Sequence, residues 1–316
     1  DLYDYDTTES FAGFLSTRIF GDILRGISVG VLILVLVGAG ESLYREAYPT
    51  KMSLTRFFSR RGLRTRRFLL SSLLGLTLTC FFFAYQEVFY TVAKGLGAWA
   101  PMEVPYTELF NTAFPWIFVL LIGFLPAVTE ESMSRMFSIP LVARFVRVPG
   151  VAIVLPALIW GFAHSNYPNQ PFYIRGVEVS LAGMLIGWLM VRVNIGTTLI
   201  WHFTVDALYT SVLLYGSKNV YYIVSATLAG LVMLLPVGYA VVSYLRSGHF
   251  EEPDGLLNSD EGPALLPTPT PAIEPEFTPP ARWSGPARLA TTAAVLASLL
   301  LFLVPAAKLD GGAELR

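Results

Sequence analysis

Residues 112–146 read TAFPWIFVLLIGFLPAVTEESMSRMFSIPLVARFV. The stretch is apolar and exceeds the roughly 20 residues that a helix needs to cross a bilayer. It nevertheless carries two adjacent carboxylates, Glu130 and Glu131, and a guanidinium, Arg135, in its middle. Ionisable side chains are costly inside a membrane, and each one is by default a candidate functional residue. The stretch therefore predicts a membrane helix that carries a functional site.

The composition of the whole chain agrees with a membrane protein. Of the 316 residues, 54% are hydrophobic and 14% are charged, whereas soluble domains carry about 25% charged residues. These values exclude an ordinary cytosolic enzyme and, for most of the chain, disorder. The formal net charge of −1 gives no reason to expect a nucleic-acid partner. The sequence begins at Asp1 without a signal-peptide pattern, so we expect an excised fragment.

Further apolar runs predict further membrane helices. Together with 112–146, they predict an all-α fold, a polytopic transmembrane helical bundle of about eight membrane helices. The other runs are 26–44, 68–91, 150–166, 177–193, 196–216, 221–245 and 288–307.

Basic residues predict the orientation of this bundle. The connection 45–67 contains eight of the chain's 22 Lys and Arg residues, whereas the connection 92–111 contains only Lys94. Short cytoplasmic loops are rich in Lys and Arg. The loop 45–67 is therefore predicted to be cytoplasmic, where its charge also favours contact with anionic lipid headgroups.

Residues 247–287 differ in composition from the rest of the chain. They contain nine prolines and seven acidic residues, and no Lys or Arg precedes Arg282. Such a segment buries too little apolar surface to fold, which predicts a disordered linker. The chain is thus expected to have four parts. These are N-terminal membrane helices with the basic loop (1–110), a membrane core (111–246), the linker (247–287), and a C-terminal membrane helix and tail (288–316).

Two more motifs place histidines in apolar runs. They are WGFAH at 160–164 and HFTVD at 202–206. His202 and Asp206 are four residues apart, as are Glu131 and Arg135, so each pair shares a helix face.

The sequence also predicts the depth of these groups in the membrane. The VPG turn at 148–150 lies midway between Glu130 and His164, so an antiparallel hairpin would bring these two side chains level. Counting from Gly196 along the run 196–216 places His202 at a shallower depth, so helix tilt or curvature has to close this gap. With the gap closed, we expect Glu130, His164, His202 and Asp206 to meet in one cavity.

This set of residue types suits the hydrolysis of peptide bonds. A glutamate beside a histidine can take a proton from water, and a second imidazole can donate to a carbonyl oxygen that becomes an oxyanion. Alternatively, Glu130, His164 and His202 can hold a zinc ion that activates the water. The sequence leaves the metal-free and zinc-dependent routes equally open. A third reading, a secondary transporter or channel, would use the same groups as a proton relay along a path.

The three motifs, in this order and spacing, resemble those of one family. EExxxR at 130–135, aromatic-xxx-His at 160–164 and Hxxx(Asn/Asp) at 202–206 are similar to the motifs of the CPBP intramembrane protease family. This family comprises type II CAAX prenyl endopeptidases and bacteriocin-processing or immunity proteins, and is also called the Abi family. The resemblance covers roughly 110–215.

The resemblance implies an intramembrane glutamic or metallo-endopeptidase. Its partners would be membrane lipid and a membrane-associated protein or peptide substrate, and its location a bacterial plasma membrane. A catalytically silent immunity or scaffold member of the family is the remaining alternative.

The resemblance also assigns roles to residues of this chain. It implies that Glu130 activates water, that Glu131 and Arg135 support the site, and that the two histidines and Asp206 position and polarise. The candidate catalytic residues are thus Glu130, Glu131, Arg135, His164, His202 and Asp206. The chain departs from the common motif with Trp160 in place of Phe and Asp206 in place of Asn, and neither change removes a catalytic group.

Overall fold

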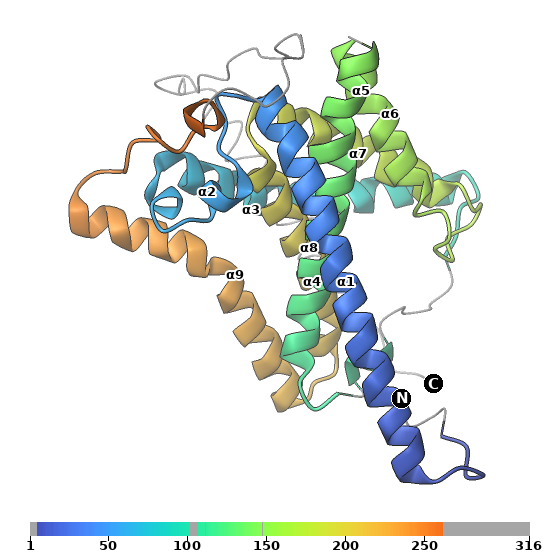
Figure 1. Ribbon diagram of the computed structural model, residues 1–316. Helices are drawn as coiled ribbons and strands as arrows, with labels where there is room; N and C mark the ends of the chain where they lie inside the picture. The colour runs from blue at the N-terminus through green and yellow to red at the C-terminus, as the bar shows by residue number, and fades with distance from the viewer. Residues whose placement is uncertain (1–4, 101–106, 111, 147, 262–316) are drawn as a thin grey trace.

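The computed structural model describes residues 5–100, 107–110, 112–146 and 148–261 (Figure 1). Helices make up most of them. The helices are α1 (Phe11–Ala47), α2 (Leu54–Phe57), α3 (Arg66–Gly95), α4 (Pro115–Glu131), α5 (Ser138–Val146), α6 (Pro149–Phe162), α7 (Ile174–Arg192), α8 (Ile195–Gly216) and α9 (Val220–Ser247). A π-helical segment, η4 (Ser132–Phe137), joins α4 to α5, and short 3₁₀ turns are η2 (Gly62–Arg64), η3 (Thr107–Phe110) and η5 (Asn258–Glu261).

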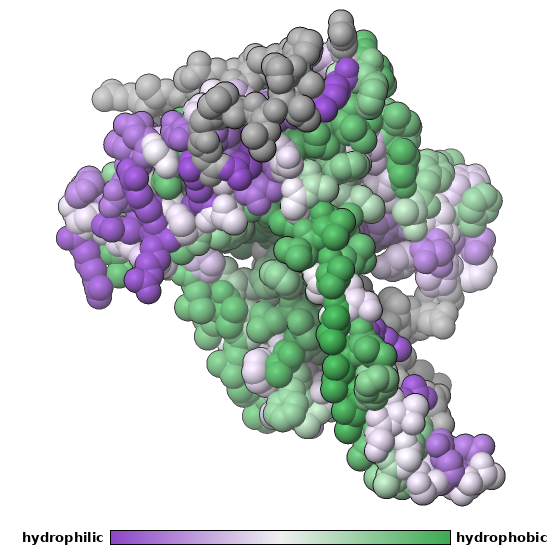
Figure 2. All heavy atoms as spheres, in the orientation of Figure 1, coloured by the Kyte–Doolittle hydropathy of each residue, from purple (hydrophilic) through white to green (hydrophobic). Residues whose placement is uncertain are grey.

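This architecture confirms the predicted all-α membrane bundle. Five helical segments are long and apolar enough to cross a membrane: α1, α3, the continuous segment α4–η4–α5, α7 and α9. Their surfaces carry large exposed hydrophobic side chains, such as Leu34 and Leu235. Figure 2 shows this hydrophobic surface over the middle of α1 and over the lower parts of α4 and α9, with hydrophilic side chains gathered over α2 and at the N-terminal end of α1. The predicted helix 288–307 lies outside the described residues.

Helix α8 lies inside the bundle, where it packs against α3, α4, α7 and α9. Its start is fixed by Asn194, whose side-chain oxygen accepts from the backbone N–H of Thr197 at 3.0 Å and so caps the helix. The amide of Asn194 also donates to Ser71 of α3 at 2.7 Å. These bonds set the position of the helix on which His202 and Asp206 lie.

Two glycines let the helices that carry the candidate site residues approach at backbone distance. At Gly123 of α4, an added Cβ would lie 2.8 Å from the carbonyl oxygen of Phe203 on α8. At Gly161 of α6, it would lie 2.5 Å from the backbone nitrogen of Ser180 on α7. Small residues at such crossings are the usual way in which membrane helices pack closely.

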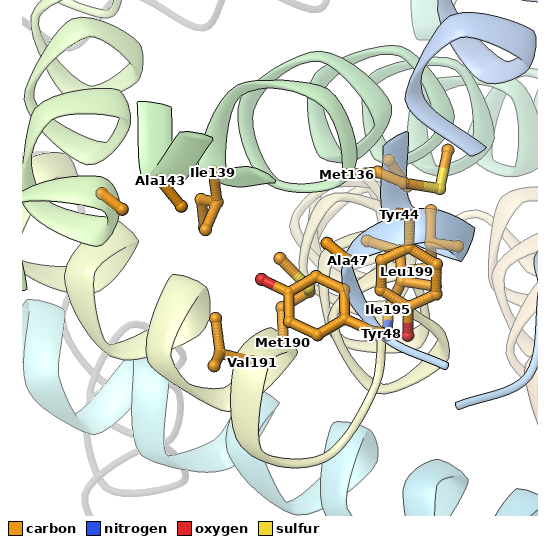
Figure 3. Packing of buried hydrophobic residues seen from close by; sticks show 12 residues of the cluster. Tyr44, Ala47, Tyr48, Met136, Ile139, Ala143, Met190, Val191, Ile195 and Leu199 are labelled. Carbon is orange, nitrogen blue, oxygen red and sulfur yellow. Dashed lines mark hydrogen bonds between the residues drawn. The ribbon is translucent and has the colours of Figure 1, made fainter. Parts of the chain in front are cut away.

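A hydrophobic cluster joins the end of α1 to η4, α5, α7 and α8 (Figure 3). Tyr44 and Met136 are fully buried in it, and Ile195 is almost so. The backbone N–H of Ile195 donates to the Tyr44 hydroxyl at 3.3 Å. The cluster therefore fixes the π segment, just beyond Glu131, against the start of α8.

The prediction of a disordered linker from residue 247 is wrong for residues 248–261. Helix α9 ends at Ser247, and Gly248 continues in the left-handed conformation with φ 72°. The segment beyond then packs on the basic loop: Glu251 lies 3.1 Å from Arg64, and Leu256 is buried. Asn258 donates from its side chain to the carbonyl oxygen of Tyr48 at 2.8 Å. These contacts supply the partners that the composition alone did not reveal. Residues 262–287 lie outside the described part, and the four-part division of the chain stays a prediction.

The α6–α7 contact predicts the effect of one methyl group. Gly161→Ala places Cβ against the backbone of Ser180, which cannot move aside as a flexible side chain can. Overpacking of this kind typically costs about 1–3 kcal/mol, so we expect a lower melting temperature in detergent. Gly150→Ala is the control, because within the described residues no atom outside its own helix and chain neighbours lies within 4 Å of the added Cβ, and it should melt like the wild type. Equal melting of both variants would contradict the close α6–α7 packing.

Candidate active site

Glu130 lies near the C-terminal end of α4 and faces two helices at once. Its Oε2 accepts a hydrogen bond from the indole Nε1 of Trp160 at 2.6 Å. The same oxygen lies 3.7 Å from Nε2 of His164 and 3.9 Å from Nε2 of His202. Both imidazoles thus point their Nε2 atoms at one carboxylate oxygen.

Glu131 and Arg135 form the buried ion pair that their spacing predicted. Arg135 Nη1 donates to Glu131 Oε1 at 3.0 Å, and the two side chains are 2% and 0% exposed. The guanidinium also lies over the ring of Trp160, 3.7 Å from its centroid. The pair spans the junction of α4 and the π segment, a kind of helix irregularity that is frequent at functional sites.

His202 is held between two carboxylates. Its Nδ1 bonds to Glu131 Oε1 at 2.8 Å, and its Nε2 lies 3.4 Å from Asp206 Oδ2. The bond to Glu131 places the hydrogen on Nδ1, because a carboxylate oxygen accepts. Glu131 therefore fixes the orientation of the His202 ring as well as neutralising Arg135.

His164 follows the end of α6 and is fixed from its other side. Its Nδ1 donates to the carbonyl oxygen of Trp160 at 2.8 Å, because a carbonyl can only accept. The ring of Tyr167 stacks on it, with centroids 6.0 Å apart. Nε2 is then the ring nitrogen directed at Glu130.

The six predicted residues meet in one place, but they differ in burial. Glu131, Arg135 and His202 are buried, whereas the side chains of Glu130, His164 and Asp206 are 29%, 17% and 22% exposed. The first three are therefore suited to hold the site, and the second three are accessible to water or a substrate. Glu130 and His164 were expected at the same depth in the membrane, and the 3.7 Å between Glu130 Oε2 and His164 Nε2 agrees with this. The expected shallower position of His202 is wrong, since His202 contacts Glu131 directly.

The predicted zinc ligands do not fit a metal ion as they are placed. A catalytic zinc needs three protein ligands at about 2.0–2.2 Å. In the described part of the chain, no group of three or more His, Cys, Asp or Glu side chains is arranged to hold one. The Glu130 oxygen that faces both histidines already accepts the Trp160 N–H. These three side chains, as placed, therefore favour activation of water without a metal.

Sequence reasoning missed a second buried charge cluster beside the site. Glu178 of α7 is fully buried, pairs with Arg175, and accepts from the Gln86 amide at 3.1 Å. Arg175 in turn lies over the ring of Tyr167, 5.3 Å from its centroid, and Tyr167 stacks on His164. The signal was present, because Glu178 stands in an apolar run three residues after an arginine.

A comparison with family models identifies the segment that contains the site. Residues 112–208 match the type II CAAX prenyl endopeptidase Rce1-like family. This segment is a domain of the CPBP family. The match confirms the resemblance read from the motifs, and it includes all six candidate residues. Neither curated proteins nor solved structures gave a match.

Over residues 112–208 the chain is thus similar to CAAX-type intramembrane proteases, and its five long apolar helical segments agree with an integral membrane protein.

The Glu131–Arg135 pair predicts a stability effect. Arg135→Ala leaves Glu131 as an unpaired buried charge, and breaking such a pair typically costs about 3–5 kcal/mol.

We expect a marked fall in melting temperature, measured in detergent. Arg144→Ala is the matched control, because Arg144 pairs with Glu46 at 2.6 Å but both side chains are part-exposed, at 29% and 18%. It should cost about 1 kcal/mol or less. An Arg135→Ala variant that melts no lower than Arg144→Ala would contradict a structural role for Arg135.

Proposed function

We propose that the chain is an intramembrane endopeptidase that hydrolyses peptide bonds of membrane-associated substrates by metal-free activation of water. The observation that carries this proposal is the convergence of both histidine Nε2 atoms on one oxygen of Glu130, at 3.7 and 3.9 Å. A hydrolase needs its groups around one reacting point, whereas a proton relay needs them spread along a path. The convergence therefore supports hydrolysis over the transporter alternative.

Glu130 is the general base in this mechanism. A water molecule placed between Glu130 and His164 gives one proton to the Glu130 carboxylate while its oxygen forms a bond to the carbonyl carbon of the substrate. His164 orients this water through Nε2, which is the acceptor because Nδ1 donates to the Trp160 carbonyl. Part-exposure of Glu130 and His164 leaves both within reach of solvent.

His202 stabilises the negative charge that develops on the substrate. As the water oxygen bonds, the carbonyl π electrons move to the carbonyl oxygen and make it an oxyanion. His202 has a carboxylate at each ring nitrogen, Glu131 at Nδ1 and Asp206 at Nε2, so both nitrogens carry hydrogen. Its Nε2–H then donates to the oxyanion, the type of contact that supplies much of the catalysis in acyl transfer.

The collapse of this intermediate completes the reaction. The carbonyl bond re-forms, the carbon–nitrogen bond breaks, and the proton held by Glu130 passes to the leaving nitrogen. The products are a carboxylic acid and an amine, and Glu130 is again a carboxylate. The family name points to prenylated CAAX proteins as the substrate class, so a lipidated CAAX-type peptide is the first substrate to test.

The mechanism predicts the result of removing the base alone. Glu130→Gln keeps the shape of the side chain and can still accept the Trp160 N–H, but it takes no proton from water. Loss of a general base costs about 10²–10⁴ in rate, so hydrolysis of a prenylated reporter peptide by the purified protein in detergent should fall by that factor.

The same assay distinguishes the alternatives. A folded Glu130→Gln protein with substantial activity would remove Glu130 from the proposed role. An inactive wild type would favour a catalytically silent family member. Activity should also survive a chelator, and loss of activity that zinc restores would replace the metal-free route by the metal-dependent one.

We propose further that the loop 45–67 faces the cytoplasm of a bacterium, on the basis of its eight basic residues. In a Cys80→Ser background, a cysteine at exposed Arg60 should react with a membrane-impermeant maleimide only after the cells are opened. A cysteine at Leu96, which is 85% exposed at the other end of α3, should react in intact cells. The reverse pattern would invert the proposed orientation.

A further inference from the structure

Trp160 lies at the centre of the candidate site, although the motifs assign it no catalytic role, and it contacts both histidines as well as Glu130 and Arg135. Its ring is edge-on to both histidines, with centroids 5.0 Å from His164 and 6.0 Å from His202. The guanidinium of Arg135 lies over the face of the Trp160 ring, 3.7 Å from the ring centroid. The Trp160 side chain is 6% exposed, so it is part of the protein interior and not a surface on which a substrate lies.

Two polar atoms of Trp160 act on the two groups proposed to hold the water. The indole Nε1–H donates to Glu130 Oε2 at 2.6 Å, and the main-chain oxygen accepts from Nδ1 of His164 at 2.8 Å. The first bond fixes the direction of the carboxylate. The second fixes the ring nitrogen of His164 that carries hydrogen. One residue therefore orients both Glu130 and His164.

The position of the indole is itself determined by helix packing. On α7, an added Cβ at Gly183 would lie 2.9 Å from Cε3 and 3.1 Å from Cζ3 of Trp160. Glycine at this position gives the ring its space, and the Arg135 guanidinium lies on its face. The ring thus has little room to turn, and its N–H keeps its direction toward Glu130.

We propose that Trp160 is a positioning residue of the active site, whose indole N–H holds the Glu130 carboxylate in the orientation in which it takes the proton from water. This inference rests on the proposed hydrolase function. A hydrogen bond between an N–H and a carboxylate restricts the carboxylate without taking its charge, which is what a general base requires.

Trp201 offers a matched control for the loss of an indole N–H. It lies on α8 and is 2% exposed, and its ring centroid is 5.5 Å from that of His202. Its Nε1 is buried without a hydrogen-bond partner in the described part of the chain. Trp160→Phe and Trp201→Phe therefore remove the same N–H group from two buried sites, and only the first removes a bond to Glu130.

The kinetic test compares the two variants on the prenylated reporter peptide. We expect Trp160→Phe to lower kcat about 10- to 100-fold, the factor for a lost hydrogen bond to a charged group, with KM within about twofold of the wild type. Trp201→Phe should keep both constants within about twofold. If Trp160→Phe does not fold, benzothienylalanine at position 160 keeps the ring shape and replaces N–H by sulfur. Wild-type kcat in either folded Trp160 variant would overturn the proposal.

A second measurement does not depend on activity. In the ¹⁵N-tryptophan-labelled protein, the indole proton resonance of Trp160, assigned by its absence in Trp160→Phe, should lie downfield and move in Glu130→Gln, where the acceptor is neutral. The Trp201 resonance should not move. A Trp160 resonance that ignores Glu130→Gln would overturn the hydrogen bond. An inactive wild type in which the resonance does move would refute the proposed function, and with it the positioning role, while leaving the hydrogen bond intact.

Discussion

The need to neutralise Arg135 inside a membrane bundle constrains the rest of the site. An arginine whose side chain is 2% exposed must have a partner, because the cost of an unpaired buried charge exceeds what helix packing can offset. Glu131 supplies that partner at 3.0 Å, and Trp160 covers the face of the cation. Glu131 then has a second task, since the same oxygen fixes Nδ1 of His202. Three helices are thereby tied together around one charge.

Because of this constraint, two adjacent glutamates have different roles. Glu131 supports the site, and Glu130 is the proposed general base. Glu131 is fully buried and its Oε1 accepts from both Arg135 and His202, whereas Glu130 is part-exposed and turned toward two imidazole Nε2 atoms. Neighbouring residues on a helix point about 100° apart, so one carboxylate can lie inside while the other reaches a different set of partners. Environment, and not residue type, separates the supporting carboxylate from the proposed base.

Much of this arrangement could be predicted from the sequence because it depends on local spacing. The apolar runs give the helices, and the four-residue intervals Glu131–Arg135 and His202–Asp206 give the two pairs. The depth of His202 could not be predicted by counting residues from a turn, because the two-residue connection before α8 and its cap at Asn194 set where that helix starts. The bond from Trp160 to Glu130 depends on the close α6–α7 contact at Gly161 and Gly183, which no local pattern specifies.

The linker prediction failed for a related reason. Averaging over a proline-rich segment concealed Leu256 and Asn258, whose partners lie some 200 residues earlier in the chain.

The central claim is that Glu130 activates water and does not itself attack the substrate. A single turnover of the prenylated reporter peptide in H₂¹⁸O, with excess enzyme, tests this most directly. Direct attack by water predicts one ¹⁸O in the new product carboxylate and none in the peptide of the enzyme that contains Glu130. Product that carries ¹⁶O after the first turnover, with ¹⁸O in Glu130, would show a covalent route through the glutamate and would contradict the account.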